Sequence, residues 1–171
     1  RTIASVYSVR PRPGAPVSTP LEWDELTPDL EPEQFTMAEV LGRVALALLF
    51  LWSAYTKFAY MEGNVGYMKA YGMPMAGLLI WPAALLELIA GAMLALGWKA
   101  RWAAIALALF TLVSMFIFHA YWSVPADQVQ NQQIHFMKNL SMLGAALFLA
   151  WFGGGPVSVD ARRHRRIPTA A

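Results

Sequence analysis

The sequence contains no cysteine, and this absence limits the chemistry that the chain can carry out with its own side chains. Without a thiol, the chain forms no disulfide and performs no thiol-based redox chemistry. A redox function would therefore depend on a bound cofactor or on a partner protein.

Charged residues are scarce. They make up 14% of the 171 residues, whereas 57% are hydrophobic, which is too apolar for an ordinary soluble domain of this size. The composition indicates a small integral membrane protein. The net charge of +2 does not indicate nucleic-acid binding, because the basic residues are concentrated at the chain ends and in short loops, where they set membrane orientation. We expect a lipid bilayer, and no nucleic acid, among the partners.

A long uncharged stretch follows Arg101 and ends at Asp127. It is sufficient for a helix across a bilayer core of ~30 Å, which takes about 20 apolar residues. Similar stretches predict four spans in total, at about residues 41–60, 75–97, 101–122 and 134–152. The connection at 61–74 is expected to be a loop or a short surface helix, and 124–133 a polar loop. The predicted fold class is all-α, an integral membrane antiparallel four-helix bundle.

The first 36 residues differ in composition from the rest of the chain. Proline and acidic residues recur there, and such a segment has too little apolar surface to fold alone. We expect three parts: an extended, Pro-rich cytoplasmic segment at 1–36, a four-span domain at 37–157, and a basic cytoplasmic tail at 158–171.

Four spans place both termini on one side of the membrane, and the basic residues indicate which side. Those on the side of the termini are Lys99, Arg101, Arg162, Arg163, Arg165 and Arg166. Those on the opposite side are Lys57, Lys69 and Lys138. Because basic residues accumulate on the cytoplasmic side, we predict a multi-pass protein of the bacterial inner membrane with both termini in the cytoplasm.

Glu87 lies near the middle of the second predicted span. It shares a face with small residues at four-residue intervals, and such faces pack against other helices. An unpaired carboxylate at this depth costs a few kcal/mol, so Glu87 should be protonated or paired, with Lys57 as the nearest cation by depth. Such a pair is either a functional site or a structural staple.

Other polar residues are predicted in the same half of the bundle. His119 ends the third span, and His135, Lys138 and Asn139 open the fourth. We take Glu87 and His119 as candidate proton-handling catalytic residues. The candidate cofactor-binding residues are Lys57, His135, Lys138 and Asn139. As alternatives, His119 and Asn139 would serve only as hydrogen-bonding groups between helices.

Methionines are concentrated on the same side, and thioether and imidazole groups together suit a soft ion such as Cu(I). Methionine also fills irregular cores, and no Met-x-x-Met pattern repeats. We therefore expect no metal site.

Much of the chain resembles the DoxX family of small bacterial four-helix membrane proteins. The resemblance covers about residues 38–160 and rests on GRVALALLFLWSAYTKF, PAALLELIAGAMLALGWKARWAAIALALFTLVSMFIFHAYW and KNLSMLGAALFLAWFGGGPVSVD. The matching positions are Lys57, Glu87, Gly91, Gly97, Arg101, His119, Lys138 and Asn139. The resemblance implies a link to membrane redox systems, because one related protein is a subunit of a thiosulfate-quinone oxidoreductase and others are linked to oxidative-stress complexes.

Residues 1–36 resemble a different family. YSVRPRPGAPVSTPLEWDEL and TPDLEPEQFT are similar to the carboxy-terminal end of the polymerase domain of bacterial end-joining DNA ligases. The acidic metal-binding residues of that family lie upstream of this segment, so we expect neither polymerase nor ligase activity. We interpret the segment as a gene-fusion remnant or a sequence-assembly accident in preference to a functional cytosolic module.

Two functions are compatible with these features. The first is a quinone-linked redox membrane subunit in which Glu87 and His119 exchange protons with a quinone, the expected cofactor. The second is a non-catalytic membrane scaffold that recruits soluble oxidoreductases, in which the polar residues fix the helix register.

Overall fold

The computed structural model describes residues 36–155 and 157–164. The side chains of Thr36, Ala38 and His164 and the predicted extended segment at 1–35 lie outside the described part. The elements, in chain order, are α1 (Thr36–Ala59), α2 (Met61–Ala70), α3 (Ala76–Leu96), α4 (Ala100–Phe118), a 3₁₀ turn η3 (Tyr121–Ser123), α5 (Ala126–Phe152) and α6 (Val159–His164).

Four of the helices are long and apolar enough to cross a membrane. These are α1, α3, α4 with the following 3₁₀ turn, and α5, which confirms the predicted all-α membrane bundle. Most large apolar side chains on these helices are exposed, including Trp52, Leu109 and Phe148. An outward-facing apolar surface is what a helix bundle presents to lipid.

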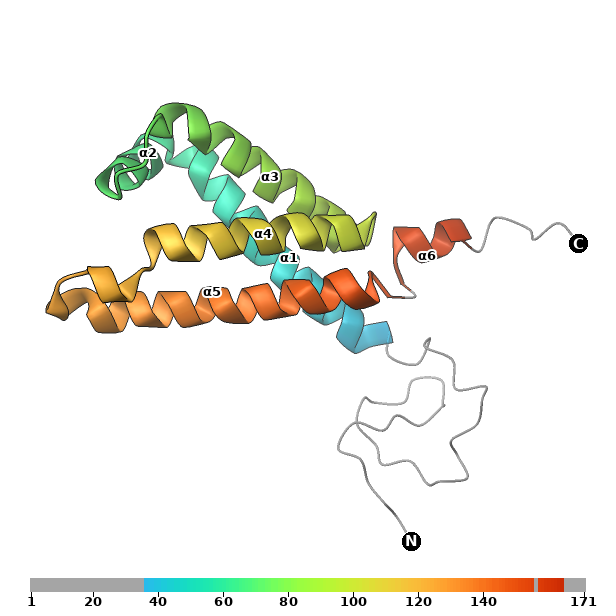
Figure 1. Cartoon of the computed structure of the whole chain (residues 1–171). Coiled ribbons are helices and arrows are strands. Elements are labelled where there is room, and N and C mark those ends of the chain that lie inside the picture. The colour runs from blue at the N-terminus through green and yellow to red at the C-terminus, as the bar shows by residue number, and fades with distance from the viewer. Residues whose placement is uncertain (1–35, 156, 165–171) are drawn as a thin grey trace, which may run out of the picture.

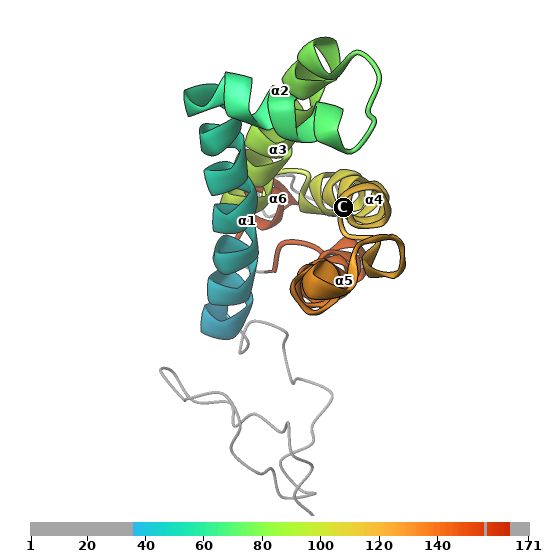
Figure 2. The ribbon, with the colours of Figure 1, turned by 90° about the vertical axis from the view of Figure 1, so that its left-hand side faces the viewer.

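The bundle consists of two helix pairs (Figure 1). α1 packs along α3, α4 packs along α5, and α3 and α4 join the two pairs. The short helix α2 lies across one end of the bundle and α6 lies at the other (Figures 1 and 2). We refer to these as the α2 end and the α6 end.

Small side chains bring the helices together over the half of the bundle nearer α6. The buried core there contains Leu46, Phe50, Leu94 and Leu107, and all its other buried members are alanines of α1, α3, α4 and α5. Gly91 of α3 also lies against α1, where an added Cβ would come within 3.2 Å of Leu51. Alanine and glycine allow close approach of helix backbones, which in lipid replaces the hydrophobic effect as the main source of helix association.

Two connections differ from the predictions. Residues 61–70 form the helix α2, one of the two structures expected there, whereas the loop predicted at 124–133 is wrong because α5 begins at Ala126. Pro125 ends the preceding turn in an extended conformation, and Asp127 lies in the first turn of α5, where a negative charge stabilises the helix. The glutamines that follow favour helix although they are polar. Hydropathy therefore located the apolar part of α5 and missed its polar start.

The end of the chain also contains a helix. Residues 159–164 of the predicted basic tail form α6, which begins directly after the buried side chain of Ser158. The hydroxyl of Ser158 accepts a hydrogen bond from the backbone N–H of Ala161 and thereby caps this short helix.

Candidate functional site

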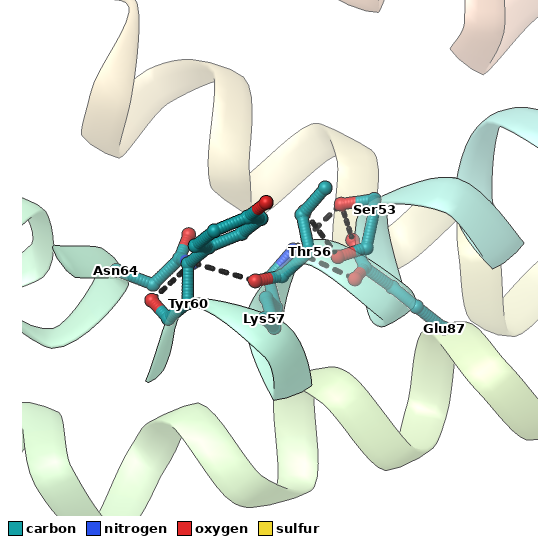
Figure 3. A network of polar contacts seen from close by, with 6 residues as sticks. All are labelled: Ser53, Thr56, Lys57, Tyr60, Asn64 and Glu87. Atoms are coloured by element: carbon teal, nitrogen blue, oxygen red, sulfur yellow. Dashed lines mark hydrogen bonds and ion pairs between the residues drawn. The ribbon is translucent and has the colours of Figure 1, made fainter. Parts of the chain in front are cut away.

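A buried ion pair joins α1 to α3. Nζ of Lys57 lies 2.7 Å from Oε2 of Glu87, and the same ammonium donates to Oγ of Ser53, also at 2.7 Å. The Ser53 hydroxyl donates to Oε1 of Glu87 at 3.0 Å, so both carboxylate oxygens are satisfied (Figure 3). Only 4% of the Glu87 side chain and 17% of the Lys57 side chain are exposed. The pairing expected from depth and helix face is confirmed.

The local sequence explains why this pair forms. Ser53 and Lys57 are four residues apart on α1 and therefore lie on the same face of the helix. Glu87 lies four residues before Gly91, whose close approach to α1 brings the two helices together at this depth. Lys57 is in the last turn of α1, where a cation is stabilised by the helix dipole.

The α1–α2 junction is tied next to this pair. The side-chain amide of Asn64 on α2 donates to the backbone carbonyls of Thr56 and Tyr60, at 3.1 and 2.9 Å (Figure 3). Thr56 lies in the last turn of α1 and Tyr60 joins α1 to α2, and the two carbonyls also accept the backbone N–H groups of Tyr60 and Asn64. Asn64 therefore fixes α2 across the end of the bundle, next to Lys57.

A cavity of about 610 Å³ lies between the two helix pairs and is bordered by α2. Its walls are mainly aliphatic and aromatic, with Phe50, Ile80, Phe110 and Phe118 among them. The polar residues that line it are Ser53, Lys57, Asn64, Glu87, Thr111, Ser114, His119 and Asn139. An apolar space of this size with a few converging polar groups is typical of a small-molecule site.

Thr111 lines this cavity and carries a buried hydroxyl that has no hydrogen-bond partner among the described residues. The residue is 2% exposed, and its Oγ1 has no hydrogen-bond partner among the described residues. A buried hydroxyl without a partner costs about 1–3 kcal/mol, so native proteins rarely retain one without a reason. Sequence analysis did not single out Thr111, because threonine is common in apolar helices and the lack of a partner for its hydroxyl depends on how the helices pack.

His119 belongs to a second network, near α2. Its Nδ1–H donates to Oε1 of Gln132 at 2.9 Å, and Nε2 of Gln132 donates to the hydroxyl of Tyr71 at 3.0 Å. The imidazole of His135 stacks on that of His119, with ring centroids 5.1 Å apart. Tyr71 packs against Tyr67 and Phe118, which both line the cavity. Burial, followed by hydrogen bonding to Tyr71, raises the pKa of Tyr67 well above its usual range.

Not all predicted site residues meet at the cavity. Lys57, Glu87, His119 and Asn139 line it, whereas His135 and Lys138 are not among its lining residues. Lys138 is exposed and lies in a surface depression on the opposite side of α5 with Gln130 and Ser141. The structure therefore does not bring Lys138 to the cavity with the other predicted polar residues, because it lies on another face of α5 from Asn139.

Asn139 lines the cavity, but its amide is engaged within its own helix. Nδ2 donates to the backbone carbonyl of His135 at 2.9 Å, and Ser141 makes the same kind of bond to Met137. These bonds lie within α5 and do not join it to another helix. Within 36–155 and 157–164, no group of three or more His, Cys, Asp or Glu side chains could hold a metal ion.

Comparison with known proteins identifies the family of this chain. Residues 38–120 match the DoxX family model. The chain is 35% identical over 123 residues to "Inner membrane protein YphA" of Escherichia coli (strain K12), a match that covers 72% of this chain and 88% of that protein. The chain belongs to the DoxX family. With its four spans, it is a multi-pass inner membrane protein.

Two further relatives extend the comparison for this DoxX-family chain. "Inner membrane protein YqjF" of Escherichia coli (strain K12) is 31% identical over 121 residues, covering 71% of this chain and 88% of that protein. The "Surfeit locus protein 4 homolog" of Schizosaccharomyces pombe (strain 972 / ATCC 24843) is 30% identical over 130 residues, covering 75% of this chain and 38% of that protein. No solved structure matches the chain.

A second family model overlaps the DoxX match. Residues 1–48 are similar to the primase-polymerase domain of LigD. The part of this match that the structure describes, from residue 36 onward, lies in α1 and thus in the membrane bundle. The resemblance seen in the sequence therefore extends a short distance into the first span.

The α6 end of the DoxX-family bundle is closed by contacts that sequence analysis missed. Arg43 of α1 is 3% exposed, and its guanidinium donates to the backbone carbonyl of Gly154 and, at 3.0 Å, to that of Val157. The carboxylate of Asp160 accepts from the backbone N–H groups of Lys99 and Ala100, at 2.8 and 3.0 Å. Asp160 thus caps α4 from a distant part of the chain.

Proposed function

We propose that this protein is the membrane subunit of a quinone-linked redox system and that the cavity of about 610 Å³ binds the quinone head group. The observation that carries the proposal is the set of polar groups lining this one apolar cavity. They belong to the buried Lys57–Glu87 pair, to Thr111, whose hydroxyl has no partner among the described residues, and to His119. A quinone head group is a flat apolar ring with carbonyl oxygens, so it suits apolar walls and hydrogen-bond donors of this kind.

Each polar residue has a distinct role in this proposal. The Thr111 hydroxyl, which has no partner among the described residues, donates a hydrogen bond to a carbonyl oxygen of the ring. Lys57, held by Ser53 and Glu87, supplies positive charge at the cavity wall. This charge favours negative charge that develops on the ring.

Proton exchange is assigned to Glu87 and His119. Glu87 is a buried carboxylate at the cavity, and His119 uses Nδ1 for Gln132, which leaves Nε2 for exchange. A bound quinone would supply chemistry in which two electrons and two protons convert it to the quinol. The electrons come from a partner oxidoreductase, because the chain has no thiol to carry them.

The scaffold function remains the second candidate for a specific reason. The Lys57–Glu87 pair is satisfied entirely by Ser53 and by its own two charges, so it would hold α1 to α3 without any ligand. In that case the protein would recruit oxidoreductases through its surface, and the cavity would be filled by lipid chains.

Quinone retention distinguishes the two candidates. The full chain is purified in mild detergent, extracted with organic solvent and analysed for quinone, and short-chain ubiquinone and menaquinone analogues are then added during thermal unfolding. We expect a bound quinone and an increase in Tm with an analogue. If no quinone is extracted and neither analogue changes Tm, while oxidoreductases still copurify, the scaffold function replaces the quinone function.

We further propose that the α6 end faces the cytoplasm. Lys99, Arg101, Arg162 and Arg163 lie at this end, and basic residues favour the cytoplasmic side. Fusions of a cytoplasm-active reporter after Ala171 and after Ser123 test this orientation. The first should be active and the second inactive, and the reverse result would invert the topology.

A further inference from the structure

Four exposed cations lie at the α6 end of the bundle. Lys99 and Arg101 lie at the start of α4, and Arg162 and Arg163 lie on α6. Among the described residues, none of these four side chains forms a salt bridge. We call these four residues the basic surface.

The basic surface is held in place by the backbone. Asp160 accepts hydrogen bonds from the backbone of Lys99 and Ala100, and its own N–H donates to the carbonyl of Gly97 at 3.0 Å. These bonds fix α6 against the α3–α4 turn (Figure 1), where the guanidinium of Arg163 lies over the ring of Trp98. Both carboxylate oxygens of Asp160 are engaged by the α4 backbone, which leaves the neighbouring cations available to an external anion.

Tryptophans place the basic surface at the depth of lipid headgroups. Lys99 and Arg163 both approach the ring of Trp98, at 5.8 and 6.0 Å from its centroid. Trp102 is 71% exposed and Trp151 is 78% exposed at the same end of the bundle. Exposed tryptophans on membrane proteins settle at the boundary between headgroups and acyl chains. The four cations are therefore level with the phosphates of one leaflet.

We propose that the basic surface is a binding site for an anionic phospholipid of the adjacent leaflet. Its phosphate would lie among the four cations and its acyl chains along the exposed apolar faces near Trp102 and Trp151. Tryptophans beside the cations favour a lipid over an acidic protein, because a lipid satisfies both the charged and the apolar part of the surface. The site is separate from the cavity and does not depend on the proposed quinone function.

Lipid-dependent unfolding of the full chain tests this proposal. The protein is unfolded thermally in nanodiscs of phosphatidylcholine alone and of phosphatidylcholine with phosphatidylglycerol or cardiolipin. The R162Q/R163Q variant is compared with K69Q/K138Q, which removes the same charge from exposed residues outside the basic surface. We expect anionic lipid to raise Tm of the wild type and of K69Q/K138Q and to have little effect on R162Q/R163Q.

Lipid retention provides a second measurement, and its salt dependence is measured on the wild type alone. Anionic lipids retained by the wild type in native mass spectrometry should decrease between 50 and 500 mM salt. R162Q/R163Q should bind them about 30-fold more weakly, at about fivefold for each cation removed. R162K/R163K should retain most of the binding.

Three results would overturn the proposal. An equal Tm of the wild type in nanodiscs with and without anionic lipid would mean that no anionic lipid is recognised. An equal increase in Tm with inorganic phosphate would indicate a simple anion site, and an equal loss in K69Q/K138Q would indicate a general effect of net charge.

Discussion

The ammonium of Lys57 and the carboxylate of Glu87 lie 2.7 Å apart, between α1 and α3 and at the wall of an apolar cavity. A buried ion pair seldom stabilises a protein more than well-packed apolar residues would, because both charges lose their solvation. Ser53 satisfies both partners and thereby reduces this cost. The hydrogen bonds of the pair are thus satisfied, and its position at the cavity indicates a chemical role.

Removing the charges of Lys57 and Glu87 distinguishes a structural staple from a proton-handling site. Glu87→Gln should lower the free energy of unfolding by about 3–5 kcal/mol, because it leaves the ammonium of Lys57 without a counter-charge. The double variant E87Q/K57M should recover most of this loss, since neither charge remains to be desolvated. Thermal unfolding in detergent measures both changes.

Two further observations complete this test. Glu62→Gln, at an exposed position of α2, serves as the control and should change stability by less than about 0.5 kcal/mol. For a structural staple, E87Q/K57M recovers both stability and redox activity, whereas for a proton-handling site it recovers stability alone. A double variant no more stable than the worse single variant would show that the two charges are not coupled.

Thr111 provides a prediction specific to ligand binding. Thr111→Val keeps the shape of the side chain and removes a hydroxyl that has no partner among the described residues, so stability without ligand should stay equal or rise. Retention of a quinone analogue should fall about tenfold, as expected for the loss of one hydrogen bond of about 1.4 kcal/mol. Thr111→Ser keeps the hydroxyl and should bind the analogue like the wild type. Unchanged retention in Thr111→Val would remove Thr111 from the site.

Part of the site could be predicted because its determinants are local. The four spans follow from long apolar runs, and the Lys57–Glu87 pair follows from depth and from the small residues that share the face of Glu87. Charges in a membrane have few ways to be satisfied, which makes their partners predictable.

Other parts depend on contacts between distant segments. Gln132 is neutral and has no distinctive pattern, yet it binds Tyr71, which lies 61 positions away. Asp160 caps α4 from 60 positions beyond Ala100, after the end of α5 and the glycines at 153–155. The start of α5 was missed for another reason, since its polar residues are good helix formers that hydropathy does not detect.

The second polar network yields its own prediction. Gln132→Leu removes the partner of both His119 and Tyr71 and should lower the free energy of unfolding by about 1–3 kcal/mol, because a buried polar group loses its bond. The neighbouring Gln133 is exposed, so Gln133→Leu is a matched control with little expected effect. Chemical-shift changes of the His119 ring should appear in the first variant and be absent from the second. Equal effects in both would mean that the network does not contribute.

The cap from α6 predicts a change localised to α4. Asp160→Ala leaves the N–H groups of Lys99 and Ala100 without acceptors and should lower the free energy of unfolding by about 1–2 kcal/mol. Hydrogen exchange should increase at the start of α4 and stay unchanged at the start of α5. Asp127→Ala serves as the control, because Asp127 lies in the first turn of α5 and is exposed. Faster exchange at α5 in Asp160→Ala would contradict a local cap.

Two glycines should respond to alanine in opposite directions. Gly97 has a φ of +66°, and an added Cβ would lie 2.4 Å from Cβ of Ser158 and 2.9 Å from the guanidinium of Arg43. Gly97→Ala combines backbone strain with displacement of the segment that carries Asp160, so a loss of more than about 3 kcal/mol is expected. Gly144 lies inside α5 with no atom within 4 Å of an added Cβ, so Gly144→Ala should stabilise by up to about 1 kcal/mol. Thermal unfolding of both variants in the same detergent measures these changes. If Gly97→Ala were as stable as Gly144→Ala, the close packing inferred at the α6 end would be wrong.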